Sequence, residues 1–366
     1  MQLHIIGGFL GSGKTTAIIG AARHLASQGK QVGVITNDQG RHLVDTEILR
    51  AEQLPTMEVS GGCFCCHFDD LNDRLRDLID QHHPDVIFAE SVGSCADVVA
   101  TVVRPLLEME IGALKPSSYT VFADARLLDR YLHDMEMPFS EGINYIFGKQ
   151  IEEAGLLFIN KTDLLDVERV KTLQALASTV YPAVELRAGC ALSRKDIIPW
   201  IDAIQEGRYP PPVRSLDIDY DFYAIAEGEL AWVDRAYQIH HHDIEMQKLL
   251  HAILSIWSQI IQENGWIDGH IKVTITTKQV SEKISLAQSG EVMHAEDLIS
   301  YPIRNYSQAK EINILLNMLV SGDPSEILNK MQGGIDEITN KTGVDLTVIR
   351  TFNRVPGYPK PTYRIP

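Results

Sequence analysis

Three absences narrow the functional class of this chain. Basic residues are not in excess: Lys and Arg number 33 against 49 Asp and Glu, which gives a net charge of −16 at pH 7. An acidic chain is not expected to bind nucleic acid or an anionic membrane, because both require a basic face. No stretch reaches the ~18 consecutive apolar residues of a membrane span. Residues 1–7 show neither the basic segment nor the long apolar run of a signal peptide.

Cysteine is scarce as well, with five residues in a chain of 366. A disulfide framework spreads its cysteines along the chain, so we expect a reducing, cytoplasmic setting instead. The distribution is uneven, because Cys63, Cys65 and Cys66 fall within four consecutive positions. Such a cluster indicates metal binding or redox chemistry.

The length predicts two domains. Residues 1–206 alternate helical patterns with short apolar strands, which is typical of a mostly parallel α/β sheet sandwiched by helices. A run of three prolines within 207–213 predicts a stiff linker that separates the domains. The strands expected before this linker lie at 3–6, 31–36, 86–89, 119–122 and 156–159.

Residues 214–366 follow a different pattern, and we expect them to form a smaller C-terminal α+β domain. An amphipathic helix is predicted over 244–262, followed by a half-buried strand at 271–275, where apolar and polar residues alternate. Further along the chain, 312–320 is expected to be helical and 346–352 to be a strand.

A phosphate-binding loop is predicted at the start of the chain. The segment from Gly8 to Thr15 fits the pattern G-x-x-x-x-G-K-[ST], between a predicted strand and a predicted helix. We expect Lys14 to reach the β- and γ-phosphates and the Thr15 hydroxyl to bind Mg²⁺. The first domain is therefore predicted to be a P-loop NTPase. The nucleotide contacts expected here come from Gly8, Gly11, Ser12, Gly13, Lys14, Thr15 and Thr16.

A base-reading motif, Asn160-Lys161-Thr162-Asp163, follows the last predicted strand of the first domain. The Asp163 carboxylate can accept hydrogen bonds from guanine N1–H and N2–H₂, whereas adenine offers no matching pair of donors. The stem of Lys161 can lie flat on the base, and Asn160 is expected to hold the loop and contact the base edge. The motif therefore predicts GTP rather than ATP.

Two carboxylates, Asp38 and Glu90, follow other predicted strands and are candidates for the Mg²⁺ shell or for ordering the attacking water. Either carboxylate can instead cap a turn. Together with Lys14 they form the expected catalytic set, and the Gly93 N–H is placed to meet the γ-phosphate. No arginine finger or catalytic glutamine can be chosen from spacing, so slow intrinsic hydrolysis is expected.

The thiol cluster lies in the stretch GGCFCCH, which begins at Gly61. Three thiolates this close can bind one soft ion, such as Zn²⁺, Cu⁺ or Co²⁺, and leave a coordination position open for transfer of the metal. His67 can add a nitrogen ligand, or it can simply start the following helix. A redox switch and a chance clustering are the alternatives.

These motifs together resemble the CobW-like metallochaperone family of P-loop GTPases. The resemblance rests on GFLGSGKTT from Gly8, GGCFCC from Gly61, ESVG from Glu90 and NKTD from Asn160. It implies binding of GTP or GDP with Mg²⁺, hydrolysis of GTP, and transport of a metal, usually zinc or cobalt, to a client metalloenzyme or cofactor-assembly protein. It also implies a Walker B role for Glu90 and metal ligation by Cys63, Cys65 and Cys66.

Two segments, 37–42 and 94–98, depart from the usual family pattern, so the metal and the client stay open. A cobalt or corrinoid-pathway GTPase is the alternative within the family. From other classes, the alternatives are a small-molecule kinase with the same loop and a regulatory GTP switch that holds structural zinc. A homodimer is compatible with all of these.

Three further features invite a metal interpretation but have simpler ones. Cys95 is expected to be a small buried residue, with accessory ligation as the alternative. Cys190 is expected beside the base pocket. The run of His240, His241 and His242 is expected to be solvated at the junction of two elements, with metal binding as the alternative.

Overall fold

The computed structural model describes residues 1–38, 46, 49–50, 52–108, 114–239, 245–277, 281–287 and 311–366. The chain divides into two compact units. The first consists of Met1–Gln39, Leu49–Glu227 and Gly357–Pro366, and the second of Gly40–Ile48 and Gly228–Pro356. Among the described residues, none of the helices combines the length and the apolar character needed to cross a membrane.

This division differs from the linker expected at 207–213. The residues just after the prolines belong to the first unit, where Leu216, Ile218 and Tyr223 are buried against Ala96 and Ile146. The last ten residues also return to the first unit. Both segments are held by burial and hydrogen bonds, which a proline run does not reveal.

A seven-stranded, wholly parallel sheet forms the centre of the first unit, in the order β3-β2-β4-β1-β5-β6-β7. This confirms the α/β prediction, and each of the five predicted strands is present. No strand is predicted at 56–60, because that edge segment mixes apolar and polar residues. The strands are β1 (Gln2–Gly8), β2 (Val32–Asp38), β3 (Thr56–Ser60), β4 (Val86–Glu90), β5 (Pro116–Asp124), β6 (Leu156–Asn160) and β7 (Glu185–Ala188).

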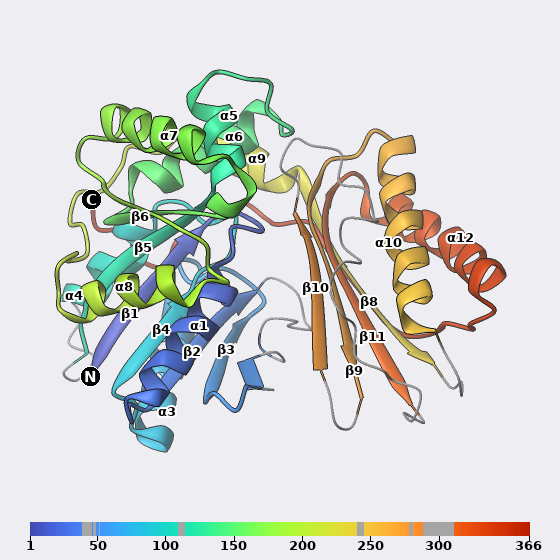
Figure 1. The fold of residues 1–366 in the computed structure, drawn as a ribbon, viewed down its shortest axis with the longest axis horizontal. Coiled ribbons are helices and arrows are strands. Elements are labelled where there is room, and N and C mark those ends of the chain that lie inside the picture. Colours follow the sequence, from blue (N-terminus) through green and yellow to red (C-terminus); the bar gives the residue numbers. More distant parts are fainter. Residues whose placement is uncertain are drawn as a thin grey trace. The chain divides into compact units, whose positions relative to one another are not determined.

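Helices flank this sheet (Figure 1). Helices α1 and α8 contact each other and cover a core in which Trp200 packs against Phe88, Phe122 and Phe158. The helical segments are α1 (Lys14–Ser27), α3 (Phe68–His82), η1 (Val99–Val103), α4 (Arg104–Glu108), α5 (Ala125–Leu132), α6 (Glu141–Glu152), η2 (Thr162–Leu164), α7 (Val167–Val180), α8 (Arg194–Gln205) and α9 (Tyr220–Gly228).

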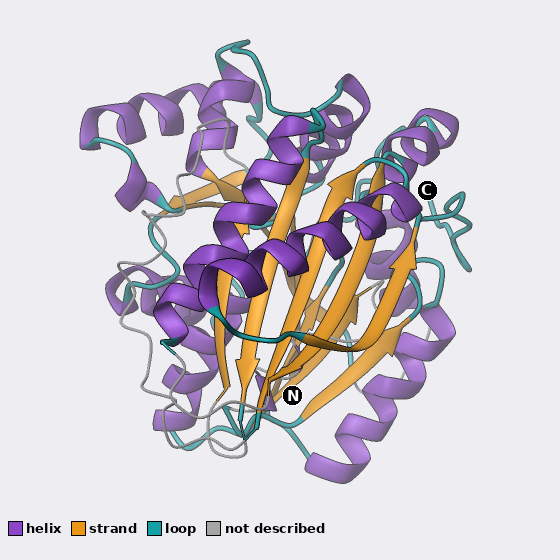
Figure 2. Ribbon diagram, turned by 90° about the vertical axis from the view of Figure 1, so that its right-hand side faces the viewer, coloured by secondary structure: helices purple, strands orange, loops and turns teal. Residues whose placement is uncertain are grey.

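The second unit is built on a five-stranded antiparallel sheet, in the order β10-β9-β11-β8-β12. Two helices, α10 (Met246–Glu263) and α12 (Pro324–Thr342), lie across one face of the sheet (Figure 2). This confirms the predicted smaller α+β domain. Its strands are β8 (Leu230–Ile239), β9 (Asp268–Thr276), β10 (Ser281–Ala287), β11 (Ile312–Ser321) and β12 (Thr347–Arg354).

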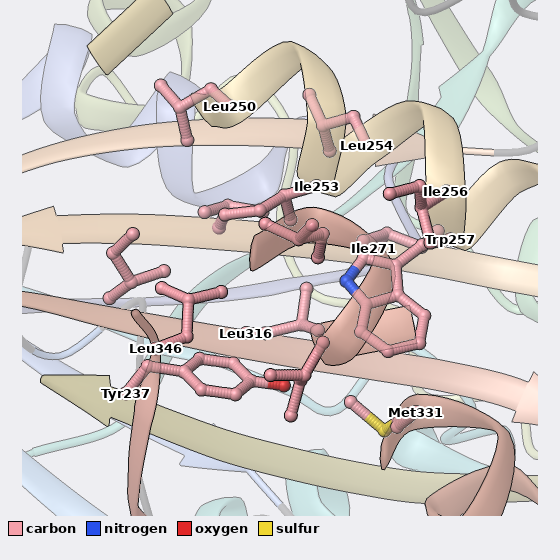
Figure 3. Close-up of a cluster of buried hydrophobic side chains, with 14 of the residues drawn as sticks. Tyr237, Leu250, Ile253, Leu254, Ile256, Trp257, Ile271, Leu316, Met331 and Leu346 are labelled. Atoms are coloured by element: carbon pink, nitrogen blue, oxygen red, sulfur yellow. The ribbon is translucent and has the colours of Figure 1, made fainter. Parts of the chain in front are cut away.

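The core of the second unit explains one wrong prediction. Residues 312–320 were expected to be helical, but they form the central strand β11. This strand pairs on both sides and is buried along most of its length, so its apolar run is nearly continuous and lacks a clear period of two. Leu316 from this strand packs with Ile253 and Trp257 of α10 and Met331 of α12 (Figure 3).

Candidate nucleotide and metal site

The predicted phosphate-binding loop lies between β1 and α1, at the carboxyl edge of the parallel sheet. Gly8 has φ +127° and Gly13 has φ +93°, in the region of backbone space that favours glycine. A Cβ atom on Gly8 would come within 2.1 Å of the carbonyl oxygen of Phe122, and one on Gly13 within 2.3 Å of Asn160 Nδ2. Glycine is therefore required at both positions, which suits a loop whose N–H groups surround an anion.

Lys14 and Thr15 begin helix α1, and both side chains are buried. The Lys14 Nζ atom donates to the carbonyl oxygens of Gly8 at 2.7 Å and Phe9 at 3.2 Å, so its ammonium group lies inside the loop. Ser12 Oγ is also buried there, with no hydrogen-bond partner within the described part of the chain. A phosphate group would satisfy such donors.

Two of the three groups expected to hold Mg²⁺ are brought together. Thr15 Oγ1 donates to Glu90 Oε1 at 2.9 Å, although the residues are far apart in the sequence. A hydroxyl and a carboxylate oxygen are the hard ligands that Mg²⁺ prefers, so this pair fits the ion. The backbone of Asp38 ends β2, but its side chain lies outside the described part of the structure.

Asn160 connects the phosphate-binding loop with the part of the site that is expected to bind the base. Its Nδ2 atom donates to the carbonyl oxygen of Ser12 at 2.6 Å, and its Oδ1 atom accepts from the Ala191 N–H at 2.7 Å. The amide therefore ties the phosphate-binding loop to the segment after β7. Asp163 lies in the exposed turn η2, where a base can reach its carboxylate. Cys190 lies beside it, and burial together with a hydrogen bond to Asp163 raises the pKa of the Cys190 thiol.

Sequence reasoning missed Asp124, which ends β5 and is 2% exposed. Its carboxylate contacts Lys161 Nζ at 2.9 Å and Arg126 at 2.8 Å. Burial raises the pKa of Asp124, but the two cations outweigh this effect and hold the pKa below its usual value. The ion pair fixes the Lys161 stem that is expected to cover the base. The sequence signal that could have identified Asp124 is its place as a carboxylate at the end of a predicted parallel strand.

The three clustered cysteines lie in the turn between β3 and α3. Backbone bonds from the Cys66 and His67 N–H groups to the Cys63 carbonyl close this turn. Their sulfur atoms all lie within 4.8 Å of one another, with 2.6 Å between Cys63 and Cys65 and 3.7 Å between Cys65 and Cys66. Cys63 and Cys65 are buried, whereas Cys66 is partly exposed. Three thiols in this arrangement form a soft-metal donor set with one accessible side.

The thiols of the cluster share protons unequally. Hydrogen bonds from Cys65, Cys66 and Cys95 lower the pKa of the Cys63 thiol well below its usual value. The bond with Cys63 raises the pKa of Cys65, and it raises the pKa of Cys66 to about 11. Cys63 is therefore the first thiolate of the cluster, and a metal ion must displace protons from the others.

Asn37, the penultimate residue of β2, holds the cysteine turn in place. Its Nδ2 atom donates to the carbonyl oxygens of Val59 at 3.1 Å and Gly62 at 2.6 Å, and its Oδ1 atom accepts from the Phe64 N–H at 2.8 Å. Because Asn37 directly precedes Asp38, the residue that holds the cysteine turn is the chain neighbour of a candidate Mg²⁺ ligand. This role is invisible in the sequence.

His67 stands at the start of α3 and does not join the sulfur cluster. Its ring packs against Gly62, where an added Cβ atom would lie 2.1 Å from the ring. The three thiols form the group in the described residues that can hold a metal ion, and His67 is not a member of it. His240, His241 and His242 lie outside the described residues.

The C-terminal segment 357–366 lies over the cysteine turn. Thr362 donates from its N–H to the Cys65 carbonyl at 2.8 Å and from its hydroxyl to the Cys66 carbonyl at 3.0 Å. Arg364 Nε contacts Asp97 Oδ2 at 2.7 Å, and Asp97 is 1% exposed. These contacts add support to the turn from a part of the chain almost 300 positions away.

Comparisons with known proteins find a matching family model and several relatives. A family model described as CobW/HypB/UreG, nucleotide-binding domain, matches residues 2–187. The chain is 27% identical over 190 residues to a zinc chaperone CobW from Sinorhizobium sp, an overlap of 46% of this chain and 53% of that protein. It is 29% identical over 216 residues to a zinc chaperone CobW from Pseudomonas aeruginosa, covering 50% and 54%.

A third relative is the zinc-regulated GTPase metalloprotein activator 1 from Dictyostelium discoideum. It is 24% identical over 238 residues, which cover 57% of this chain and 49% of that protein. The chain thus spans about half the length of the curated relatives it matches.

Proposed function

The chain belongs to the CobW/HypB/UreG family, and on this premise we propose that it is a GTP-hydrolysing metallochaperone that carries zinc. The observation that carries the proposal is the gathering of the Cys63, Cys65 and Cys66 sulfurs within 4.8 Å of one another. These thiols lie in the same compact unit as the phosphate-binding loop. Zinc favours thiolate ligands, and a site with three protein ligands leaves a position for exchange.

Each part of the nucleotide site has a role in this proposal. Lys14 and the loop N–H groups bind the phosphates, and Asp163 reads guanine while Lys161 covers the base. Thr15 and Glu90 hold Mg²⁺, with Asp38 as the further candidate. When bound, Mg²⁺ neutralises charge that develops on the phosphates. The chain's own contribution is to orient GTP and to keep water ordered at the carboxylates.

The nucleotide and metal sites are coupled through β2 and β4. Glu90 ends β4 and lies in register with Thr36, which precedes Asn37 on the neighbouring strand β2. Asn37 in turn holds the cysteine turn by three hydrogen bonds. A change at the γ-phosphate that moves the end of β2 therefore also moves the thiols. In this proposal GTP assembles the metal site, and hydrolysis loosens it.

Delivery of the metal completes the proposal. Cys66 is the partly exposed member of the cluster, so a ligand from a client metalloenzyme or a cofactor-assembly protein can approach from that side. Transfer by ligand exchange needs such an accessible position. We place this exchange in the cytoplasm, where reduced thiols persist.

Zinc titration with and without a non-hydrolysable GTP analogue tests the coupling. We expect the analogue to change the zinc affinity by a factor of about 5–150, and zinc to change the affinity for the analogue by the same factor. Replacing Cys65 and Cys66 together by Ser is expected to abolish tight zinc binding. Cys190→Ser is the matched control and should keep it. Equal zinc affinities with and without the GTP analogue would contradict the coupling between the two sites. Tight zinc binding that survives the double replacement would instead assign the zinc site to the histidines.

The nucleotide assignment has its own test. Release of inorganic phosphate from GTP without an acceptor substrate is expected, and it would be absent in a small-molecule kinase. Asp163→Asn should weaken GTP binding by about 100-fold or more, because the substituted amide mismatches one guanine donor. Glu168→Gln, on the exposed side of α7, is the control. If Asp163→Asn bound GTP with an affinity similar to that of the unaltered protein, the assignment of Asp163 to guanine recognition would be contradicted.

A further inference from the structure

A buried glutamine outside the predicted motifs holds the loop that follows β4. Gln150 of α6 donates from Nε2 to the carbonyl oxygen of Gly93 at 2.9 Å and to that of Cys95 at 2.8 Å. We propose that Gln150 is a positioning residue for GTP hydrolysis, because it fixes the backbone whose N–H at Gly93 is expected to meet the γ-phosphate. This inference rests on the GTPase activity within the proposed function and adds a residue to it.

Gly93 lies directly against the phosphate-binding loop. A Cβ atom on Gly93 would come within 2.5 Å of Leu10 Cδ2 and 3.1 Å of the Leu10 backbone nitrogen, so a larger residue would push the two loops apart. Glu90, three positions before Gly93, accepts from Thr15 Oγ1 at 2.9 Å. The loop after β4 therefore borders the place where the terminal phosphate is expected.

The turn that carries Gly93 leaves its N–H group available for an anion. The Cys95 N–H donates to the Val92 carbonyl at 3.1 Å and closes this turn. In a planar trans peptide the N–H points away from the preceding carbonyl, so the Gly93 N–H points out of the turn. Within the described part of the chain this N–H donates to no other residue. Carbonyl oxygens would repel a phosphate, and Gln150 holds two of them toward α6.

Helix α6 gives Gln150 a fixed place beside the nucleotide site. The residue is 1% exposed. About one turn earlier on the helix, the Phe147 ring packs edge-on against Phe9 of the phosphate-binding loop, with 5.6 Å between the ring centroids. Three positions later, the Glu153 carboxyl accepts from the Val99 N–H at 3.1 Å. The same helix thus contacts the phosphate-binding loop and the segment after β4, and Gln150 lies between these two contacts.

Space filling alone does not account for an amide at this position. The Oε1 atom of Gln150 is buried and has no hydrogen-bond partner among the residues that the structure describes. A buried acceptor without a partner costs stability, whereas an apolar side chain of similar length, such as methionine, would avoid this cost. The two N–H donors that face the loop are therefore the property that distinguishes glutamine here.

Steady-state GTP hydrolysis by Gln150→Met tests the proposal. Methionine has a similar length but no donor, so the loop loses both hydrogen bonds. We expect kcat to fall by about 10- to 100-fold, because a small misplacement of a group at the reacting phosphate has an effect of this size. The affinity for GDP should stay unchanged, since GDP lacks the γ-phosphate. Gln174→Met, on the partly exposed side of α7, is the matched control and should change neither quantity.

The outcomes separate this proposal from the proposed function. An unchanged kcat in a Gln150→Met variant that binds GDP normally would overturn the positioning role. If Gln150→Met loses GDP binding, Gln150→Asn gives the same comparison, because its shorter amide cannot reach both carbonyls. Loss of GDP binding in both variants would show that Gln150 only maintains the fold, and it would overturn the proposal too. Absence of GTP hydrolysis in the unaltered protein would instead refute the proposed function.

Discussion

Two asparagines organise the site at the scale of single residues. Asn160 joins the phosphate-binding loop to the segment after β7, and Asn37 joins β2 to the cysteine turn. An amide suits both positions because it donates and accepts at once without carrying charge. Neither could be exchanged for aspartate without turning a donor into an acceptor toward a buried carbonyl.

Glu153 makes the stability of the first unit depend on pH. Burial raises the pKa of its carboxyl to about 8, and the Val99 N–H and the Tyr119 hydroxyl donate to it at 3.1 and 3.3 Å. The folded state keeps this proton while the unfolded state loses it above its ordinary pKa of 4.5. The free energy of unfolding should therefore fall as pH rises from about 5 to 8, by at most about 1.4 kcal/mol per pH unit from this group.

Glu153→Gln should remove this contribution, because the amide cannot ionise. Urea unfolding of the first unit at several pH values between 5 and 8 measures the effect. Glu168→Gln is the control, since Glu168 is 82% exposed and its ion pair with Lys171 is solvated. An unchanged pH slope in Glu153→Gln would show that this carboxyl is already ionised in the folded protein.

At this scale the sequence predicts those site residues that lie close together in the chain. Lys14, Thr15, Asp163 and the three clustered cysteines belong to short motifs in which spacing alone predicts proximity. Asn37 could not be found in this way, because its partners lie more than 20 positions away. The Thr15–Glu90 hydrogen bond was foreseeable only by assuming that the carboxyl ends of parallel strands meet at one edge.

At the scale of elements, the C-terminal segment 357–366 supports the cysteine turn through hydrogen bonds. Removing the Arg364 side chain would leave the buried Asp97 with the Tyr220 hydroxyl at 2.6 Å but without its cation. We expect Arg364→Ala to destabilise the first unit by about 1–3 kcal/mol, because a buried carboxylate loses a charged partner. Zinc affinity should fall as well, since Thr362 of the same segment binds the carbonyls of Cys65 and Cys66.

The matched control lies in the same segment. Lys360 is exposed, so Lys360→Ala should change neither the unfolding free energy nor the zinc affinity by a measurable amount. Chemical denaturation and zinc competition against a chelator give the two readings. Equal zinc affinities of Arg364→Ala and the unaltered protein would show that the segment only covers the turn.

Elements were predicted well where their pattern was periodic and poorly where both faces are buried. The amphipathic helix α10 shows its apolar face in the sequence. By contrast, the central strand β11 has few polar positions to mark a period of two, so its sequence wrongly predicts a helix. The position of 357–366 depends on hydrogen bonds to a distant turn, which no local pattern encodes.

At the scale of the whole molecule, each unit has a core of its own. Leu316 is fully buried at the centre of the second unit, and its truncation to Ala should destabilise that unit by about 2–5 kcal/mol. GTP binding should be unchanged, because the described nucleotide residues lie in the first unit. Calorimetry should therefore show two unfolding transitions. Leu316→Ala should lower the midpoint temperature of one transition, and a GTP analogue should raise the midpoint temperature of the other. A single transition that responds to both would contradict independent cores.

The number of domains was predictable from length, but the division was not. The proline run suggested a boundary at 207–213, whereas the chain leaves the first unit at Glu227 and re-enters it at Gly357. Helix α9 is kept in the first unit by long-range contacts: Tyr223 bonds to the loop that carries Cys95, and Glu227 accepts from Ser94 Oγ at 2.8 Å.

The return of the chain at Gly357 makes residues 228–356 an insertion in the first unit, while Gly40–Ile48 is a separate, shorter segment of the second unit. Tyr358, just after the re-entry point, donates from its hydroxyl to Asp221 of α9 at 3.0 Å, so the chain departs and comes back near the same helix. An inserted segment whose two ends lie close together can be exchanged with little effect on the elements that flank it. Evolution could thus replace residues 228–356, and a laboratory could bridge them with a short linker, while the thiols and the phosphate-binding loop keep their scaffold.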